Sequence, residues 1–449
     1  MMGLKRKKHV VWIVSAGVLF SFLALSVALF DVVDRRPYTQ MDYYKKMIAQ
    51  IEHIQINQDS LCGKYLKCGW SVENITPPYP LSMAGYSFRG LSNGVHDSIY
   101  ARVLVFDNGI RKIAIVSVDL LIFPPEVKYI LDTLLKNKPV ESSSILYTAT
   151  HTHSASGGWA KRIAGRATAG KFNPQYVEMI AHKITKALYN AVTDMSDAKI
   201  GYAQYDASRY VKNRLGYADS RVDPWLRVIK IEKQNGSKAL MLTFSAHPNC
   251  LSPQFMKIAG DYPTALSDIL KKTTDYEFIS FSAGAVGSHA PSDFASNVQK
   301  MGAGLAEIVT KNSHNIRMQE TTTLYSIKLP LWLREPHLRL HKHVRIRPWV
   351  FDFIIGRDTP TIDMFRIGNI VIIGTPCDLS GELMSDFEHT CKQKNIHLIA
   401  TSFNGGYIGY INSDKHYDEY RSETMEMNWF GPYNQAYFTE IINCMLNKF

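Results

Sequence analysis

Short apolar runs alternate with helical patterns along most of the chain. Residues 99–106 and 112–118 are apolar runs joined by Asp107-Asn108-Gly109, and an Asn-Gly pair supplies the positive φ angles of a tight hairpin turn. Residues 176–192 carry apolar side chains at helical spacing, which predicts a helix with one buried face. This mixture of hairpins and strand–helix units predicts an α/β fold, with mixed sheets flanked by helices. The length allows two or three domains, but one large domain is also allowed, and no linker in the sequence forces a division.

The same alternation continues to the end of the chain. Further strands are predicted over residues 144–147, 239–246, 278–281 and 396–402, and a hairpin over 364–373 that turns at Gly368-Asn369. Further helices are predicted to begin at Pro124-Pro125 and at Tyr262-Pro263, and to cover residues 381–392.

Polar residues able to do chemistry follow several of these strands. His151 and His153 come directly after residues 144–147, and the alternation of side chains lets both imidazoles point the same way. His247, Asp378 and Tyr410 each follow another predicted strand. Since strand ends converge on one edge of an α/β sheet, these five side chains can meet in space. Two histidines, a carboxylate and a phenolate form a plausible zinc-binding set.

Each of these residues also has a simpler interpretation when it is taken alone. His151 and His153 can be hydrogen-bonded loop histidines, and His247 can be a turn histidine before a proline. Asp378 can cap the helix that follows it, and Tyr410 can be an ordinary core aromatic. Their combination at successive strand ends is what favours a metal site.

The N-terminus differs from the rest of the chain. Residues 5–8 are all basic. Residues 10–30 carry no charge, and this run is as long as the roughly 20 residues that a membrane-spanning helix needs. The upstream positive charge predicts a cytoplasmic N-terminus, with the rest on the periplasmic or extracellular side. A secreted protein is the alternative, because Ser26-Val27-Ala28 resembles a signal-peptide cleavage site.

These features divide the chain into four parts. Residues 1–9 are expected to be a basic cytoplasmic tail, residues 10–30 a transmembrane signal anchor, residues 31–70 a linker or stem, and residues 71–449 the main domain. The net charge of +11 suits an anionic membrane surface, whereas no nucleic-acid partner is expected, because no nucleic-acid motif is visible.

The cysteines and one basic segment leave further alternatives open. Cys62 and Cys68 are close in sequence and can pair if the compartment is oxidising, while the other four cysteines are expected to be buried thiols. Residues 329–350 mix tryptophans with arginines, a composition that suits either a lipid headgroup interface or an ordinary loop over the core.

Several motifs together resemble the neutral, non-lysosomal ceramidase family. The stretch His151-Thr152-His153-Ser154 with Gly157-Gly158 is similar to the family's HTHSxxGG motif, the most specific of the set. The other matching segments are Gly94-Val95-His96-Asp97 with Tyr100-Ala101-Arg102, Asn213-Arg214 with Val222-Asp223-Pro224, Phe244-Ser245-Ala246-His247-Pro248, and Asn404 through Tyr410-Ile411.

The resemblance implies that residues 71–449 fold like the N-terminal catalytic domain of that family. It implies zinc held by His151, His247, Asp378 and Tyr410. It also implies that His153 and Arg214 line the reacting centre, where they orient an amide and stabilise an oxyanion. The implied reaction is hydrolysis of the N-acyl bond of ceramide-like sphingolipids, with a sphingolipid or other N-acyl lipid as the binding partner at a membrane surface.

Two positions depart from the family pattern. The family's acidic ligand is a glutamate in a PGE motif, whereas this chain has Pro376-Cys377-Asp378, so the metal must shift or the backbone must come closer. The family's serine nucleophile lies in GDVSPN, and here Gly287 stands at that place with Ser288 one position later. The nucleophile is therefore either Ser288 or water activated by zinc, and we favour the water, with His153 as a proton shuttle to the leaving amine.

Two other functions stay open at this point. A zinc hydrolase of the same fold acting on another N-acyl or ester substrate is favoured by the altered turn around Gly287 and Ser288. A membrane-anchored lipid-binding protein without turnover is compatible with Asp378 and Gly287. The retained histidines argue against that last alternative, because buried polar groups without a role are costly.

Overall fold

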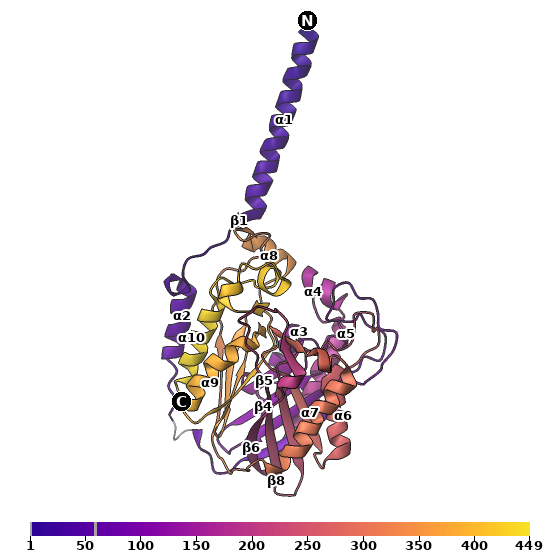
Figure 1. The fold of residues 1–449 in the computed structure, drawn as a ribbon, viewed down its shortest axis with the longest axis vertical. Helices are drawn as coiled ribbons and strands as arrows, with labels where there is room; N and C mark the ends of the chain where they lie inside the picture. Colours follow the sequence, from indigo (N-terminus) through magenta and orange to yellow (C-terminus); the bar gives the residue numbers. More distant parts are fainter. Residues whose placement is uncertain (1, 58–60) are drawn as a thin grey trace.

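A long N-terminal helix, α1 (Met2–Leu29), projects from a body of mixed sheets and helices (Figure 1). The computed structural model describes residues 2–57 and 61–449. Within this part of the chain, residues Trp12–Leu29 form the one helical stretch that is long and apolar enough to cross a membrane, and the body buries none of it. A membrane anchor and a signal sequence both fit this description.

The main sheet has eight strands, and the two ends of its strand order lie close together. Only its two terminal pairs, β9 with β10 and β4 with β5, are parallel. The hydroxyls of Thr148 on β5 and Ser282 on β10 are 2.8 Å apart, which joins these terminal strands. In sheet order the strands are β10 (Phe278–Ala283), β9 (Lys238–Phe244), β8 (Trp225–Lys233), β6 (Ser196–Asp206), β2 (Lys67–Asn74), β3 (Tyr100–Asp107), β4 (Lys112–Val118) and β5 (Ile145–Ala149).

A second sheet of four strands packs against the main sheet. Its order is β12 (Leu324–Pro330), β14 (Thr361–Ile367), β15 (Ile370–Gly374) and β17 (His397–Thr401). Buried side chains from both sheets, including Ile115, Met241 and Ile372, form a shared apolar core. Three short strand pairs complete the sheets: β1 (Phe30–Val32) with β13 (Val344–Ile346), β7 (Val211–Asn213) with β11 (His289–Pro291), and β16 (Asp378–Leu379) with β18 (Tyr410–Ile411).

Helices cover both sheets. α5 (Pro174–Thr193) buries an apolar stripe against β2 and β3, and the Asn173 side chain caps its start by accepting from the Tyr176 amide. The other helices are α2 (Asp42–Glu52), α3 (Pro125–Leu134), α4 (Ile163–Ala169), α6 (Asp261–Thr273), α7 (Val298–Asn312), α8 (Pro348–Ile354), α9 (Met384–Gln393) and α10 (Asn434–Leu446). Of these, α2 lies within the segment expected to be a stem, and it packs against α10.

The predicted α/β class, with mixed sheets flanked by helices, is confirmed. Both predicted hairpins form, as β3 with β4 and β14 with β15. The predicted strands before His151 and His247 are β5 and β9. All six cysteines are free, so the pairing that the sequence left open for Cys62 and Cys68 does not occur, and Cys68 is fully buried.

Three of the four arginines of residues 329–350 point inward, which corrects the idea that these three face lipid headgroups; the fourth, Arg347, is half-buried. Arg334 donates to the backbone carbonyls of Asp34 and Arg36, at 2.7 and 2.6 Å. Arg339 lies over a tyrosine ring, and Arg345 forms an ion pair with an aspartate of β1. All three arginines are buried, because carboxylates, carbonyls and an aromatic ring elsewhere in the chain satisfy them.

Candidate metal centre

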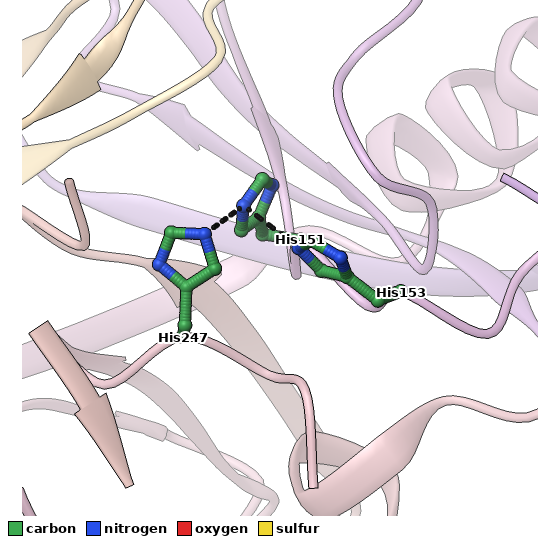
Figure 2. Close-up of side chains that lie close together, drawn as sticks. All are labelled: His151, His153 and His247. Atoms are coloured by element: carbon green, nitrogen blue, oxygen red, sulfur yellow. Dashed lines mark hydrogen bonds between the residues drawn. The ribbon is translucent and has the colours of Figure 1, made fainter. Parts of the chain in front are cut away.

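Three histidines from two strand ends of the main sheet meet in the interior. His151 follows β5 by two residues, and His247 follows β9 by three. The Nε2 atom of His151 lies 2.9 Å from that of His247 and 3.3 Å from that of His153 (Figure 2). The ligand atoms of the three rings lie within 4.8 Å of one another, so the predicted convergence of these strand ends is confirmed.

The hydrogen bonds at Nδ1 determine which ring nitrogen of each histidine carries the proton. Nδ1 of His151 lies 2.6 Å from the Leu121 carbonyl oxygen, and Nδ1 of His247 lies 2.9 Å from that of Val286. Nδ1 of His153 lies 2.9 Å from the carbonyl oxygen of Gly85. Because a carbonyl oxygen only accepts, each Nδ1 must donate, which leaves a lone pair on every neutral Nε2. Three lone pairs that face one another repel, and a cation between them removes that repulsion.

Asp378 completes the set with a carboxylate. Its Oδ1 lies 3.5 Å from Nε2 of His151 and 3.7 Å from Nε2 of His247. Its Oδ2 accepts a hydrogen bond of 2.7 Å from the Tyr407 hydroxyl. Oδ1 is buried and accepts no hydrogen bond from the described residues. An orphaned carboxylate oxygen beside two imidazole lone pairs has the chemistry of a zinc-binding site, so these residues fit the metal.

Burial dominates the electrostatics of this cluster. It is the main cause that lowers the pKa of all three histidines, for His153 to about 3, and the charge of Arg214 adds to the effect. Burial also raises the pKa of Asp378 to about 7, against the opposing effect of hydrogen bonds and of Arg214. The histidines are therefore neutral at physiological pH, which is the form that binds a metal.

Tyr410 and Arg214 lie beside Asp378. Tyr410 is the residue directly opposite Asp378 in the parallel pair of β16 and β18. Arg214 donates to the Tyr410 hydroxyl at 3.2 Å and to the Gly287 carbonyl at 3.0 Å. Its Nε is buried and has no acceptor among the residues that the structure covers. The structure thus brings the two residues to the cluster, and Arg214 keeps one donor without a protein partner.

Ser288 does not point into this cluster. Its side chain is fully buried, and its Oγ lies 2.7 Å from Nδ1 of His289 and 2.8 Å from the Ser380 hydroxyl. Nε2 of His289 accepts a 2.8 Å hydrogen bond from the Asp223 amide. The proton of His289 therefore resides on Nδ1, which donates to Ser288. In this tautomer His289 has no lone pair with which to deprotonate Ser288.

Gly287 packs directly against the backbone of β16. A Cβ atom on Gly287 would lie 2.4 Å from the backbone oxygen of Asp378. The Gly287 amide also donates to the Leu379 carbonyl at 2.7 Å. The backbones at Gly287 and Asp378 therefore pack closely against each other. No side chain fits at position 287 without moving β16.

Sequence reasoning missed three residues that position the cluster. Tyr407 holds Oδ2 of Asp378, and Phe403 stacks on the His151 ring with 4.2 Å between centroids. Arg89 donates to the carbonyl of His153 at 2.7 Å and so fixes its loop. Tyr407 stands three residues before Tyr410 in the same Gly-rich loop, and this spacing was the one available signal. No pattern in the sequence marks Arg89.

An apolar cavity of about 420 Å³ leads away from the cluster. Its inner end includes His151 and Tyr407, and its walls include Leu121, Trp159 and Trp429. The volume lies within the roughly 300–1,000 Å³ that is usual for small-molecule sites. His151 thus links the cluster to a cavity that an apolar ligand can occupy.

Comparison with known proteins agrees with this geometry. A curated relative, Neutral ceramidase A of Dictyostelium discoideum, is 26% identical over 229 residues, which cover 46% of this chain and 32% of the relative. The match thus spans about a third of that relative's length. Among solved structures, the neutral ceramidase of Pseudomonas aeruginosa has a TM-score of 0.73 at 17% identity, covering 86% of this chain and 74% of that chain.

A structure titled as ceramidase complexed with C2 gives similar values. Its TM-score is 0.72 at 17% identity, and the superposition covers 86% of this chain and 75% of that one. These two structures confirm the fold. The family model for neutral/alkaline non-lysosomal ceramidase, N-terminal, matches residues 66–298, which is more than half of the chain. The chain therefore belongs to the neutral/alkaline non-lysosomal ceramidase family.

Proposed function

We propose that the protein is a zinc-dependent amidohydrolase that cleaves the N-acyl bond of ceramide-like sphingolipids to a fatty acid and a sphingoid base. The observation that carries this proposal is the convergence of three histidine lone pairs and the orphaned Oδ1 of Asp378, in a cluster whose His151 also lines an apolar cavity. Family membership supports the same substrate class.

We assign the metal to His151, His247, Asp378 and Tyr410. His151 and His247 are the two imidazoles close to the carboxylate, and Tyr410 lies opposite Asp378 in the β16–β18 pair. When bound, zinc supplies a Lewis acid and lowers the pKa of water to about 7, which makes a nucleophile available near neutral pH. The described geometry supports this set through ligand type and burial.

We assign two further roles to side chains around the cluster. Arg214 has an Nε that meets no acceptor within the described residues, and we assign it to donate to the amide carbonyl oxygen as negative charge develops there. His153 is the least buried of the three histidines. With its Nδ1 proton held by Gly85, its Nε2 is placed to accept a proton and pass it to the leaving amine.

The burial of Ser288 favours water as the nucleophile. We expect Ser288→Ala to keep turnover within about tenfold of the parent, because the hydroxyl has no base and does not face the cavity. The measurement is kcat for ceramide in mixed micelles, corrected for the folded fraction. Ser292→Ala is the control, because this half-buried hydroxyl donates only to the Arg209 carbonyl, away from the cluster. Loss of most turnover in Ser288→Ala alone would instead identify Ser288 as the nucleophile.

The proposal is tested by measuring ceramide hydrolysis and bound metal on the same sample of purified full-length protein. We expect stoichiometric zinc, turnover that disappears on chelation, and recovery when zinc is added back. Bound zinc without ceramide turnover would point to another N-acyl or ester substrate. Absence of both metal and turnover would contradict the enzyme proposal and favour a lipid-binding protein.

A further inference from the structure

The end of α1 is tied to the body by hydrogen bonds. The last carbonyls of a helix have no partner within the helix. Here the Val27 carbonyl accepts from Nε of Arg347 at 2.7 Å, and the Ala28 carbonyl accepts from Nε1 of Trp349 at 3.0 Å. The Leu29 carbonyl accepts from the Arg347 amide at 2.9 Å. Residues of the body thus complete the C-terminal turn of α1.

The attachment continues directly after the helix. Strand β1 pairs antiparallel with β13, with Asp31 opposite Arg345 and Val32 opposite Val344. Asp31 and Arg345 also form an ion pair of 3.0 Å between their side chains. We call residues 27–32 together with 344–349 the latch. Because it combines a strand pair, an ion pair and helix-end hydrogen bonds, the latch fixes the direction in which α1 leaves the body.

Exposed apolar side chains gather next to the latch. Trp349 and Phe353 on α8 are 55% and 67% exposed, Val32 on β1 is 69% exposed, and Ile163 on α4 is 54% exposed. α4 and α8 contact each other, and both lie at the end of the body from which α1 leaves (Figure 1). We call these four side chains the latch-side surface. Gathered apolar side chains of this size mark an interaction site rather than ordinary surface.

The cavity of the metal centre opens at the same place. Its outer walls include Ile354 and Ile355 at the end of α8, and Ala164 and Thr168 of α4. The cavity therefore runs from His151 to the region between α4 and α8, where the latch-side surface lies. The cavity wall is mainly apolar, so an apolar chain that enters there meets mostly apolar side chains on the way to His151.

We propose that α1 stays in the mature protein and that the latch seats the latch-side surface on the membrane spanned by α1, so that lipid substrate enters the cavity from that same bilayer. This inference rests on the proposed function for the substrate and on α1 as a membrane span. The lipid bilayer is the partner that fits, because Trp349 lies level with the last turn of an apolar helix, where tryptophans favour the membrane interface.

Charge on α4 supports a lipid partner. Arg162 and Arg166 are exposed on or just before this helix, as is Lys161. Basic side chains at the rim of an apolar surface attract anionic headgroups. A protein partner with an apolar face would instead have to fit around α1 and leave the mouth of the cavity open.

Thiol protection tests the seating without reference to activity. The full chain carrying Cys62→Ser is placed in nanodiscs of phosphatidylcholine and phosphatidylserine, with either Phe353→Cys or Ile110→Cys added. Ile110 is equally exposed, at 59%, but lies in the β3–β4 turn, at the opposite end of β4 from the cavity. Labelling of the Cys62→Ser background is subtracted, and each rate is divided by that of the same cysteine in denaturant.

We expect a membrane-impermeant maleimide to label position 353 at least about tenfold more slowly than position 110, because lipid covers the former. Adding Arg347→Ala with Trp349→Phe, which removes the hydrogen bonds to Val27 and Ala28, is expected to bring the two rates closer together. Equal rates with the latch intact would overturn the proposal. Protection that occurs only in native membranes would also overturn it, since a protein would then cover the surface.

Substrate choice tests the route into the cavity. We expect Phe353→Asp to lower turnover by about tenfold or more when long-chain ceramide is in the same vesicle membrane as the enzyme. Turnover of a water-soluble short-chain N-acyl substrate should not change. Ile110→Asp should change neither. An equal loss on both substrates in Phe353→Asp would overturn the route. If the parent protein hydrolyses neither substrate, the proposed function fails, while the thiol experiment still decides the seating.

Discussion

Replacement of His247 by alanine is expected to abolish metal binding and to lower kcat/KM by about 10³-fold or more, because a Lewis acid contributes several kcal/mol to such reactions. His247 is fully buried, its Nδ1 is held by the Val286 carbonyl, and its Nε2 faces His151 and Asp378. His153 stays in the cluster in this variant, but its Nε2 faces His151, and within the described residues it is not paired with Asp378 as His247 is. The measurements are metal content and kcat/KM on the same preparation.

Two matched variants separate loss of metal from loss of fold. His53→Ala, at an exposed histidine that ends α2, is expected to keep both metal and turnover. Asp378→Asn keeps the volume of the side chain and the acceptor for Tyr407, yet it should also lose the metal, because the carboxylate charge is gone. If His247→Ala is folded and retains its metal and turnover, the assignment of the metal centre is wrong.

Replacement of Gly287 by alanine is expected to lower kcat/KM by about 10²-fold, since a misplacement of about 1 Å in a site can have that effect. The added Cβ would lie 2.4 Å from the Asp378 carbonyl oxygen and 3.0 Å from the Leu379 carbonyl carbon. Both neighbours are backbone atoms, so β16 must move and carry Asp378 away from the histidines. The free energy of unfolding should also fall by about 1–3 kcal/mol through overpacking.

Gly90→Ala is the matched control for this change, because a Cβ there meets only the Cε atom of Met256, at 3.9 Å. Metal affinity and kcat/KM are measured together with urea unfolding. Gly287→Ser should behave like Gly287→Ala, although the family pattern has serine at this place. Parent-like metal affinity and turnover in Gly287→Ala would show that β16 gives way without displacing Asp378.

Much of the candidate site was predictable because strand ends converge. His151 and His247 follow β5 and β9, and the neighbouring strands β9 and β10 run parallel, as do β4 and β5. Simple topology therefore placed chemically active residues at one edge. The pairing of β16 with β18 then sets Asp378 opposite Tyr410, which strand-end logic also anticipated.

The remaining features depend on contacts between distant parts of the chain. Tyr407 positions Asp378 by donating a hydrogen bond to its Oδ2, and this contact cannot be predicted from the local sequence alone. The alternation of arginines and aromatics in residues 329–350 left two orientations open, because the groups that decide between them lie far away. Arg345, for example, turns inward because Asp31, more than 300 residues earlier in the chain, provides its charge partner.

The wide spacing of the proposed ligands along the chain has a consequence for biogenesis. His151, His247 and Asp378 are contributed by separate segments, and Tyr410 pairs with Asp378 only after β18 has been made. Contacts this far apart in sequence form late, because the ends of long loops must first be brought together. During synthesis from the N-terminus, the histidines therefore emerge well before Asp378, and the proposed metal centre can be complete only after Tyr410 has been made.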